Sequence, residues 1–257
     1  MRCNTKYDIL IHADALDNQG AGVHVYLVQF LNHLHKHSNL KCILLRSSKN
    51  KNYPKWKEIG IGMSPVALLW KALRMFVCIP YLARKYKVAY VLEPAHFWPF
   101  FVPNKAKSIT VIHDLSPILF PKFHVFHSAV LQCCFLKRIL LTTDIILSNS
   151  RSTTSDLLNY LPKEHQKKIY TLPLWRDDFF CRTQEDSALE KYHITSPFFL
   201  TVGTIEPRKN HTTILTAFEQ FCKEHGTNYQ LVIAWGLGWK YSCLLYTSDA
   251  ADEGHGV

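Results

Sequence analysis

One local pattern constrains the fold more than any other: a short apolar run leads through a glycine-containing turn into a stretch with helical periodicity. The first example begins with the apolar run 7–12, passes the turn 17–22 and continues into residues 23–34. Apolar residues there recur three and four positions apart, which predicts a helix with one apolar face. A second example joins the run 199–203 through a polar turn to a helical stretch at 210–225. Such strand–turn–helix units are typical of α/β proteins.

Strand and helix patterns also alternate along the rest of the chain. Further strands are expected at 40–45, 89–92, 108–112, 144–148 and 231–234, and helices at 66–86 with a break at Pro80, at 124–142 and at 151–161. The strand segments are apolar throughout, which is typical of a parallel sheet covered on both faces. The sequence therefore predicts an α/β protein with a doubly wound, Rossmann-like N-terminal domain and the beginning of a second Rossmann-like domain.

The periodicity ends between residues 172 and 195, where charged and aromatic residues dominate. We therefore predict an N-terminal domain at 1–172, a crossover at 173–196 and the start of a second domain at 197–242. Residues 243–257 contain no Lys or Arg and resemble translated sequencing-adapter text. We interpret them as a non-native tail; a genuine short polar tail is the alternative.

The amino-acid composition limits the class of protein and the kind of partner that we expect. The chain has 30 Lys and Arg against 20 Asp and Glu, a formal charge of +10, and 47% of its residues are hydrophobic. That apolar content excludes intrinsic disorder, and the charge favours an anionic partner. The eight cysteines include no CxxC pair and no signal-peptide pattern opens the chain, so we expect reduced thiols and a cytoplasmic location.

The segment 66–83 is the most apolar part of the chain, and cations continue it to residue 87. Lys71, Arg74 and Pro80 interrupt it, so it is not expected to span a membrane. Aromatic and apolar side chains interleaved with cations suit a peripheral contact with an anionic bilayer. An ordinary helix packed on the sheet, with a charged outer face, is the alternative.

Two segments could bind phosphate. Gly20 and Gly22 lie between the first strand and the first helix, where a backbone without side chains can approach an anion at a helix amino end. Arg208 and Lys209 lie between the strand ending at Gly203 and the next helix, at the strand edge where open α/β sheets bind ligands. The alternatives are an ordinary glycine turn and a solvated basic turn.

Four segments, in order along residues 1–242, carry a resemblance to a known family. They are Gly20-Ala21-Gly22-Val23-His24-Val25-Tyr26, Val111-Ile112-His113-Asp114-Leu115-Ser116-Pro117, Ile146-Leu147-Ser148-Asn149-Ser150-Arg151-Ser152-Thr153 and Val202-Gly203-Thr204-Ile205-Glu206-Pro207-Arg208-Lys209-Asn210-His211. They resemble, respectively, the glycine loop, the His-Asp segment, the turn before the interdomain crossover and the donor-binding segment of family-4 glycosyltransferases, which have the GT-B fold.

The resemblance implies an acceptor-side N-terminal domain and a C-terminal domain that binds a nucleotide-diphosphate sugar. Arg208 and Lys209, with Gly203, would hold the donor diphosphate, and Gly20 and Gly22 would approach it from the other domain. His113 would lie near the reacting carbon of the sugar as a hydrogen-bond partner; a histidine satisfied within the core is the alternative. Further donor or acceptor contacts are expected from Asp114, Glu206 and Asn210.

Members of the family that this chain resembles usually retain anomeric configuration and need no metal or other cofactor. The resemblance therefore implies a retaining hexosyltransferase in polysaccharide biosynthesis, with GDP-mannose the favoured donor and a glycan or lipid-linked acceptor. Two residues depart from the family pattern: Thr204 stands where some members have Arg, and Trp235 stands where a small residue is usual. The family's paired glutamates are expected beyond residue 242, so we expect a truncated, inactive fragment.

The alternative function is a non-catalytic basic module that binds anionic lipid or nucleic acid. Nucleic acid is not expected, because the sequence has no zinc-finger spacing and no aromatic-basic ribonucleoprotein motif.

Overall fold

The structure is a computed structural model, and it describes residues 6–17, 22–47, 53–62, 72–95, 102–103, 105–120, 135–173, 187–195, 197–203, 205 and 209–234. The chain divides into two compact units, Met1–Asp177 and Asp178–Val257. Each unit is described by itself.

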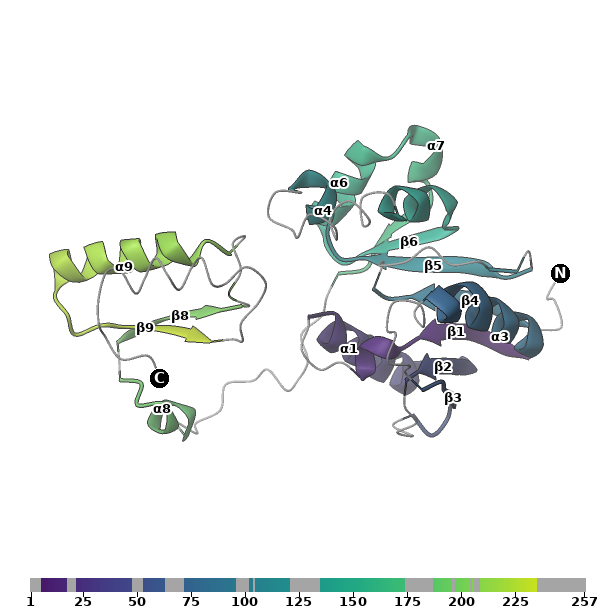
Figure 1. Cartoon of the computed structure of the whole chain (residues 1–257), viewed down its shortest axis with the longest axis horizontal. Coiled ribbons are helices and arrows are strands. Elements are labelled where there is room, and N and C mark those ends of the chain that lie inside the picture. Colours follow the sequence, from purple (N-terminus) through teal and green to yellow (C-terminus); the bar gives the residue numbers. More distant parts are fainter. Residues whose placement is uncertain are drawn as a thin grey trace. The chain divides into compact units, whose positions relative to one another are not determined.

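The first unit is built on one seven-stranded sheet in which every strand pair is parallel (Figure 1). Its strands are β1 (Tyr7–His12), β2 (Cys42–Arg46), β3 (Lys57–Gly60), β4 (Val88–Glu93), β5 (Lys107–Ile112), β6 (Ile145–Ser148) and β7 (Ile169–Thr171). Their order in the sheet is β3-β2-β1-β4-β5-β6-β7. From β1 the chain first winds outward to β2 and β3 and then returns to the other side of β1, so the winding reverses between β1 and β4.

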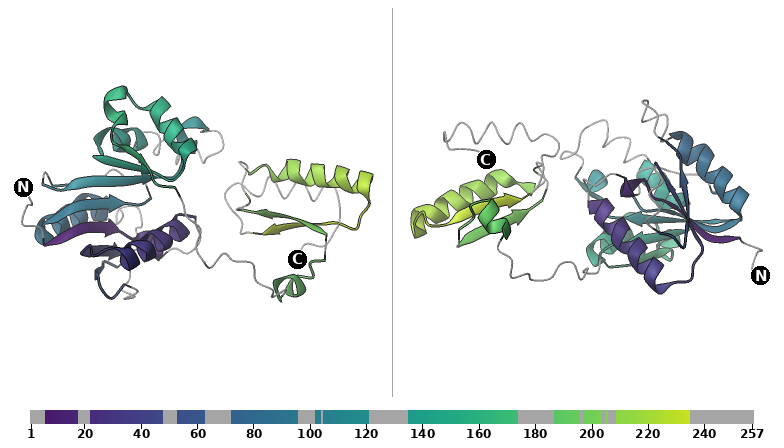
Figure 2. Two further views of the ribbon diagram at one scale, coloured as in Figure 1. Left: turned by 180° about the vertical axis from the view of Figure 1, so that it is seen from behind. Right: turned by 90° about the horizontal axis from the view of Figure 1, so that it is seen from below.

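Helices cover both faces of this sheet. They include α1 (Gly22–His37), α3 (Ile79–Tyr86), α4 (Ser116–Leu119), α6 (Arg151–Tyr160) and α7 (Lys163–Gln166); a 3-10 turn, η1 (Asp14–Leu16), follows β1, and residues 135–142 are also helical. Figure 2 shows α1 and α3 on opposite sides of the strands. Alternation along β1 explains this: Ile9 and Ile11 pack with Leu27 of α1, whereas Leu10 packs with Ile79 of α3.

The second unit is smaller and also consists of parallel strands connected by a helix. Strands β8 (Phe198–Val202) and β9 (Gln230–Ala234) form a parallel pair, and α9 (His211–His225) connects them. Phe199 of β8 packs edge-on against Phe218 and Phe221 of α9. A short helix, α8 (Ser187–Lys191), precedes the strands, in the stretch expected to be an irregular crossover.

The predicted fold class is confirmed: the sheet of the first unit is parallel and doubly wound, and a second β-α-β unit follows it. The break expected at Pro80 is wrong. A five-residue π-helical turn, η2 (Arg74–Cys78), runs directly into α3, and Pro80 lies in the first turn of α3. A helix tolerates proline in its first turn, and the π turn joins the two helical segments through a hydrogen bond from the Ile79 N–H to the Arg74 carbonyl.

In the part of the chain that the structure describes, no helix is long and apolar enough to cross a membrane.

Candidate functional site

Polar side chains gather at the carboxyl edge of the first sheet. Because all its strands are parallel, His12 of β1, Glu93 of β4 and His113 after β5 lie at the same edge. The winding reverses between β1 and β4, and open α/β sheets bind ligands beside such a reversal. The three residues therefore mark the candidate site of the first unit.

His113 is held by neighbours on several sides. Its Nε2 lies 2.8 Å from the carbonyl oxygen of Pro94, and its Nδ1 lies 3.3 Å from Nδ2 of Asn149. The ring of Tyr26 meets it edge-on, with ring centroids 4.9 Å apart. Thr153 donates a hydrogen bond to the backbone carbonyl of His113 at 3.1 Å. These contacts leave the ring little freedom to turn.

The contacts also fix the protonation of His113. A carbonyl oxygen only accepts hydrogen bonds, so Nε2 carries the proton that points to Pro94. Burial lowers the pKa of His113, although the Pro94 contact and the nearby Asp114 carboxylate oppose that shift. His113 is therefore a neutral ring at pH 7, with Nδ1 as its acceptor atom.

Asp114 is exposed, and its Oδ1 accepts hydrogen bonds from the backbone N–H (3.0 Å) and the hydroxyl (2.7 Å) of Ser116. This arrangement stabilises the start of α4, a common role for an Asp in a turn.

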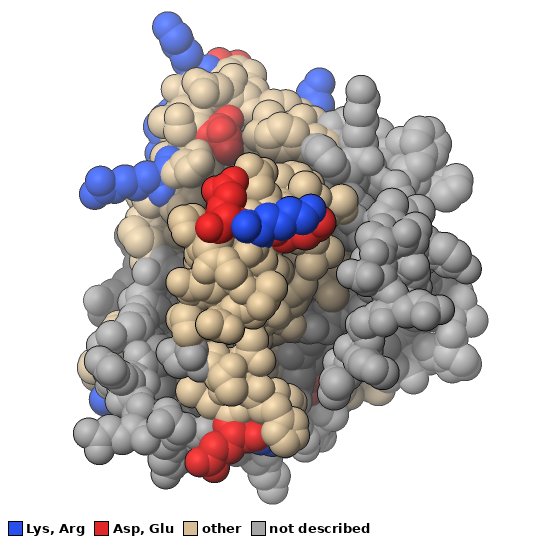
Figure 3. All heavy atoms as spheres, turned by 90° about the vertical axis from the view of Figure 1, so that its left-hand side faces the viewer, with Lys and Arg blue, Asp and Glu red and all other residues tan. Residues whose placement is uncertain are grey.

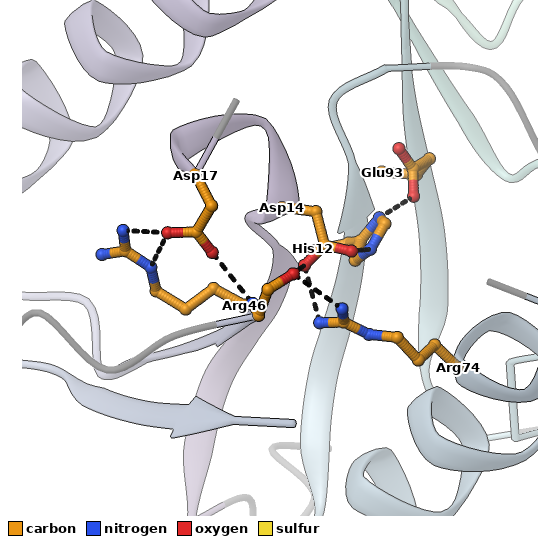
Figure 4. A network of polar contacts seen from close by, with 7 residues as sticks. His12, Asp14, Asp17, Arg46, Arg74 and Glu93 are labelled. Atoms are coloured by element: carbon orange, nitrogen blue, oxygen red, sulfur yellow. Dashed lines mark hydrogen bonds and ion pairs between the residues drawn. The ribbon is translucent and has the colours of Figure 1, made fainter. Parts of the chain in front are cut away.

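The glycine loop is described in part. Gly22 is the exposed first residue of α1, and a Cβ placed on it would meet nothing within 4 Å. Gly20 lies outside the described residues. Asp17, just before the loop, accepts hydrogen bonds from Nε and Nη2 of Arg46 and from the backbone N–H of Ser47 (Figure 4). The amino side of the loop is thus attached to the end of β2.

A buried ionic network lies beside that attachment, and no motif in the sequence predicted it. His12 contacts Glu93 (Nδ1–Oε2, 2.6 Å) and Asp14 (Nε2–Oδ2, 3.0 Å), and Arg74 contacts Asp14 (Nη2–Oδ1, 2.6 Å; Figure 4). Burial disfavours a charged His12, but the Glu93 and Asp14 carboxylates outweigh it and raise the pKa of His12 to about 10. His12 is therefore a cation at neutral pH.

The strand pattern held a signal for this network. His12 and Glu93 each end an apolar run, Ile9-Leu10-Ile11 and Val91-Leu92, at the carboxyl end of a parallel strand. A polar residue in that position faces the ligand-binding edge. Two such residues on neighbouring strands could have been paired from the sequence once the strand order was known.

In the second unit, a cation covers the glycine at the end of β8. Gly203 has φ +154°, and Cε of Lys209 lies 3.5 Å from the position that a Cβ on Gly203 would take. The exposed Lys209 side chain therefore lies against the Gly203 backbone, just before the first residue of α9. A helix amino end carries unpaired N–H groups and a partial positive charge, so this arrangement suits an anion.

The neighbouring candidate residues extend this second cluster. Asn210 has φ +52° and accepts a hydrogen bond from the Thr213 hydroxyl at 2.9 Å. His211 is buried, and its Nδ1 has no hydrogen-bond partner in the described part of the chain. Glu206 and Arg208 lie outside the described residues. The structure thus brings Gly203, Lys209 and Asn210 together in one unit, and His113 and Asp114 together in the other.

Among the described residues, no group of three or more His, Cys, Asp or Glu side chains is placed to hold a metal ion. The described cysteines, Cys42, Cys78 and Cys222, are free thiols.

Sequence comparisons find sugar transferases. No protein-family model matches the chain. It is 24% identical over 145 residues to the O-antigen chain mannosyltransferase B of Escherichia coli, an alignment that covers 55% of this chain and 38% of the relative. It is also 45% identical over 49 residues to a serotype-specific mannosyltransferase WbdA of Escherichia coli, covering 19% of this chain and 6% of that protein.

Structural comparisons support the fold over nearly the whole chain. The crystal structure of Anabaena HepE in complex with UDP and glucose matches with a TM-score of 0.61 at 10% identity, covering 95% of this chain and 66% of HepE. The complex of HepE with UDP-glucose matches with a TM-score of 0.60, also at 10% identity, covering 95% of this chain and 65% of HepE. The chain thus spans about two thirds of HepE and shares its α/β fold.

Proposed function

We propose that this chain belongs to a retaining, metal-independent glycosyltransferase that moves a sugar from a nucleotide-diphosphate sugar to a glycan or lipid-linked acceptor. The mannosyltransferases among its relatives favour a mannosyl donor, with GDP-mannose first. The HepE complexes with UDP and UDP-glucose support a nucleotide sugar as the ligand class. The matched relatives are longer than this chain, so activity is assigned to the whole protein.

In this proposal the diphosphate binds at the amino end of α9. Lys209 and Arg208 neutralise the charge that the leaving diphosphate gains as the glycosidic bond breaks. Gly203 lets the backbone come close to the phosphates. Glu206 and Asn210 would contact the sugar or ribose.

Residues of the first unit have further roles in this proposal. Gly20 and Gly22 would bind phosphate through the backbone, and His113 would accept a hydrogen bond from a sugar hydroxyl near the reacting carbon. Asp114, exposed in the turn after β5, would contact donor or acceptor. No step in this scheme requires a metal ion or other cofactor.

The observation that carries the proposal is the Lys209 side chain lying across Gly203 at the start of α9. Titration of the chain with GDP, UDP and the corresponding nucleosides, followed by NMR or calorimetry, tests it. The diphosphates should bind, with chemical-shift changes at Gly203 and Lys209, and the nucleosides should bind much more weakly. Equal binding of nucleosides and diphosphates, or no binding of either, would contradict a diphosphate site.

The alternative function is a non-catalytic basic module, and the described residues of the second unit do not carry the excess of basic charge that such a module needs. Those residues include three lysines (191, 209 and 223) and three glutamates (190, 219 and 224). On the face shown in Figure 3, blue and red side chains are interspersed among tan ones in the described part of the surface. Binding to nucleic acid with a steep salt dependence and no response to nucleotide sugars would favour the alternative.

We also propose that the first unit rests on the cytoplasmic face of an anionic membrane, where a lipid-linked acceptor would be found. The outer face of η2 and α3, with the residue just before η2, carries exposed apolar side chains on successive turns: Leu73, Val77 and Tyr81. The opposite face, with Met75, Ile79 and Leu82, packs into the core. A helix that is apolar on both faces usually has a partner on each.

The charges of this helix favour an anionic lipid surface as the outer partner. Arg84, Lys85 and Lys87 are exposed at its carboxyl end, and residues 72–88 contain no Asp or Glu. Lys85 lies over the ring of exposed Tyr81, with Nζ 5.6 Å from the ring centroid. Aromatic and apolar side chains flanked by cations suit the boundary between headgroups and acyl chains.

A further inference from the structure

We propose that Glu93 is a positioning residue for His113: it holds the turn after β4 in the place where the Pro94 carbonyl fixes the His113 ring. The role of the His113 ring in the reaction, a contact with the donor sugar, rests on the proposed function. The positioning itself rests on contacts within the first unit.

Both carboxylate oxygens of Glu93 are engaged. Oε2 lies 2.6 Å from Nδ1 of His12, on the neighbouring strand β1, and Oε1 accepts a hydrogen bond from the backbone N–H of Ala95 at 3.0 Å. The Glu93 side chain is only 2% exposed. One buried carboxylate therefore ties the turn after β4 to β1, across the point where the winding of the sheet reverses.

Pro94 lies between the two ends of this tie. Its carbonyl oxygen accepts the hydrogen bond from Nε2 of His113. Since Glu93 fixes the backbone on one side of Pro94 and binds Ala95 on the other, the direction of the Pro94 carbonyl depends on Glu93. The direction of that carbonyl in turn decides which nitrogen of His113 carries the proton.

His12 supplies the charge that keeps Glu93 in place. It lies between the Glu93 and Asp14 carboxylates, and Arg74 pairs with Asp14 from η2. Buried charges are stable only when they are paired and hydrogen-bonded. The same network that anchors the turn after β4 thus also anchors the turn after β1.

The consequence concerns the chemistry of His113. With the proton on Nε2, Nδ1 is the acceptor nitrogen and receives its contact from the Asn149 amide. A sugar hydroxyl that replaces this long contact would donate to Nδ1. His113 would therefore act on the sugar as a hydrogen-bond acceptor and not as an acid.

The ring nitrogen signals of His113 test the proposal in the 257-residue chain. In ¹⁵N-histidine-labelled protein, with the His113 signals assigned by comparison with His113→Gln, the wild type should show the neutral ring with the proton on Nε2. Glu93→Ala should give a mixture of the two neutral forms. The Nε2 proton should also exchange with water about tenfold faster, as expected for the loss of one hydrogen bond.

Three variants separate positioning from general damage. Glu93→Gln retains a side-chain oxygen that can accept from Ala95, so it should keep the wild-type His113 signals. Asp14→Ala removes the other carboxylate from His12 but no contact of the turn after β4, so it should leave His113 unchanged. If Glu93→Ala does not fold, Glu93→Asp replaces it, because its shorter side chain cannot reach both His12 and Ala95.

Some results would overturn the proposal. They are a wild-type ring protonated on Nδ1, an unchanged His113 in folded Glu93→Ala or Glu93→Asp, and equal changes in Glu93→Ala and Asp14→Ala. None of these measurements uses a nucleotide sugar. A failure of the positioning role is therefore distinguishable from a failure of the proposed donor site.

Discussion

Arg46 donates two hydrogen bonds to one carboxylate oxygen of Asp17, from Nη2 at 2.5 Å and from Nε at 3.2 Å. The Arg46 side chain is 1% exposed and that of Asp17 16% exposed. Their pairing joins the end of β2 to the residue before the glycine loop. The loop expected to approach the diphosphate therefore begins at a buried, charged anchor.

Removal of that anchor should destabilise the first unit. Asp17→Ala leaves the Arg46 guanidinium buried, and among the described residues Glu58, 3.6 Å from Nη1, is its remaining ion-pair partner. Breaking one side of a buried ion pair costs about 3–5 kcal/mol, and the remaining Glu58 contact places this loss near 3 kcal/mol. Native-state hydrogen exchange at the amides of β2 measures this loss of stability.

The exposed Glu164→Ala in α7 is the control and should change the stability by less than about 0.5 kcal/mol. A similar effect of both variants would contradict the role of the Arg46–Asp17 pair.

The stability of the first unit should fall as the pH rises above neutrality. The pKa of His12 rises from 6.5 to about 10 in the folded chain, so protonation of His12 favours the folded state. This contribution is complete below about pH 6.5 and is lost as the pH rises through about 10, at up to about 1.4 kcal/mol per pH unit. The slope is measured by urea unfolding at several pH values, followed by the NMR signals of β1.

His12→Gln is the matched variant for this dependence. It should lower stability at pH 7, because Glu93 and Asp14 lose their shared cation, and it should flatten the slope between about pH 6.5 and about pH 10. Cys42 is a second group to consider, because burial raises the pKa of its thiol to about 12. Its contribution remains in both proteins and cancels in the difference. Equal slopes for wild type and His12→Gln would exclude His12 as the source.

Much of the fold could be predicted from apolar runs and helical spacing. The main strands of both units and the helices α1, α6 and α9 lie where the periodicity placed them. The strands β3 and β7 were missed, because Lys57-Glu58-Ile59-Gly60 and Ile169-Tyr170-Thr171 are short and have no continuous apolar run. β3 and β7 are the two edge strands of the sheet, so they bury less apolar surface than the central strands. They form because their backbones pair with β2 and β6, which no apolar run in their own sequence indicates.

The candidate site could be predicted only where a local motif marks it. His113, Gly203 and Lys209 lie in recognisable segments, and the structure places Lys209 against Gly203, a contact between residues six apart in sequence. The pair His12–Glu93 joins residues 81 positions apart. No local pattern encodes such a contact, because it depends on β1 and β4 being neighbours in the sheet. Local motifs therefore mark the phosphate-binding candidates, whereas the buried charges of the first unit become visible only in the fold.

Lys209→Ala should weaken diphosphate binding. The variant removes the ammonium group that lies across Gly203, and the loss of a charge-assisted hydrogen bond of about 1.5–3 kcal/mol corresponds to a decrease in affinity of about tenfold to one hundredfold. Calorimetric titration with GDP measures the change. Lys223→Ala is the control, because Lys223 lies near the carboxyl end of α9, where it pairs with Glu219, whereas Lys209 precedes the amino end of that helix. If Lys223→Ala weakens binding as much as Lys209→Ala, the effect reflects net charge and not a site at the start of α9.

Membrane contact should depend on the outer face of η2 and α3. Wild-type chain should co-sediment with vesicles that contain phosphatidylglycerol and not with vesicles of phosphatidylcholine alone, and added salt should release it. Val77→Asp places a charge among the exposed apolar side chains, 53% exposed in the wild type, and should reduce binding about tenfold or more without disturbing the core. Arg84→Glu with Lys85→Glu should have a comparable effect, since each cation near an anionic surface contributes about 1 kcal/mol.

The exposed pair Lys163→Glu with Lys167→Glu makes the same charge change around α7 and should retain most of the binding. Equal loss in both double variants would indicate attraction by net charge alone, and saturable self-association in the absence of vesicles would assign the apolar face to a second copy of the chain.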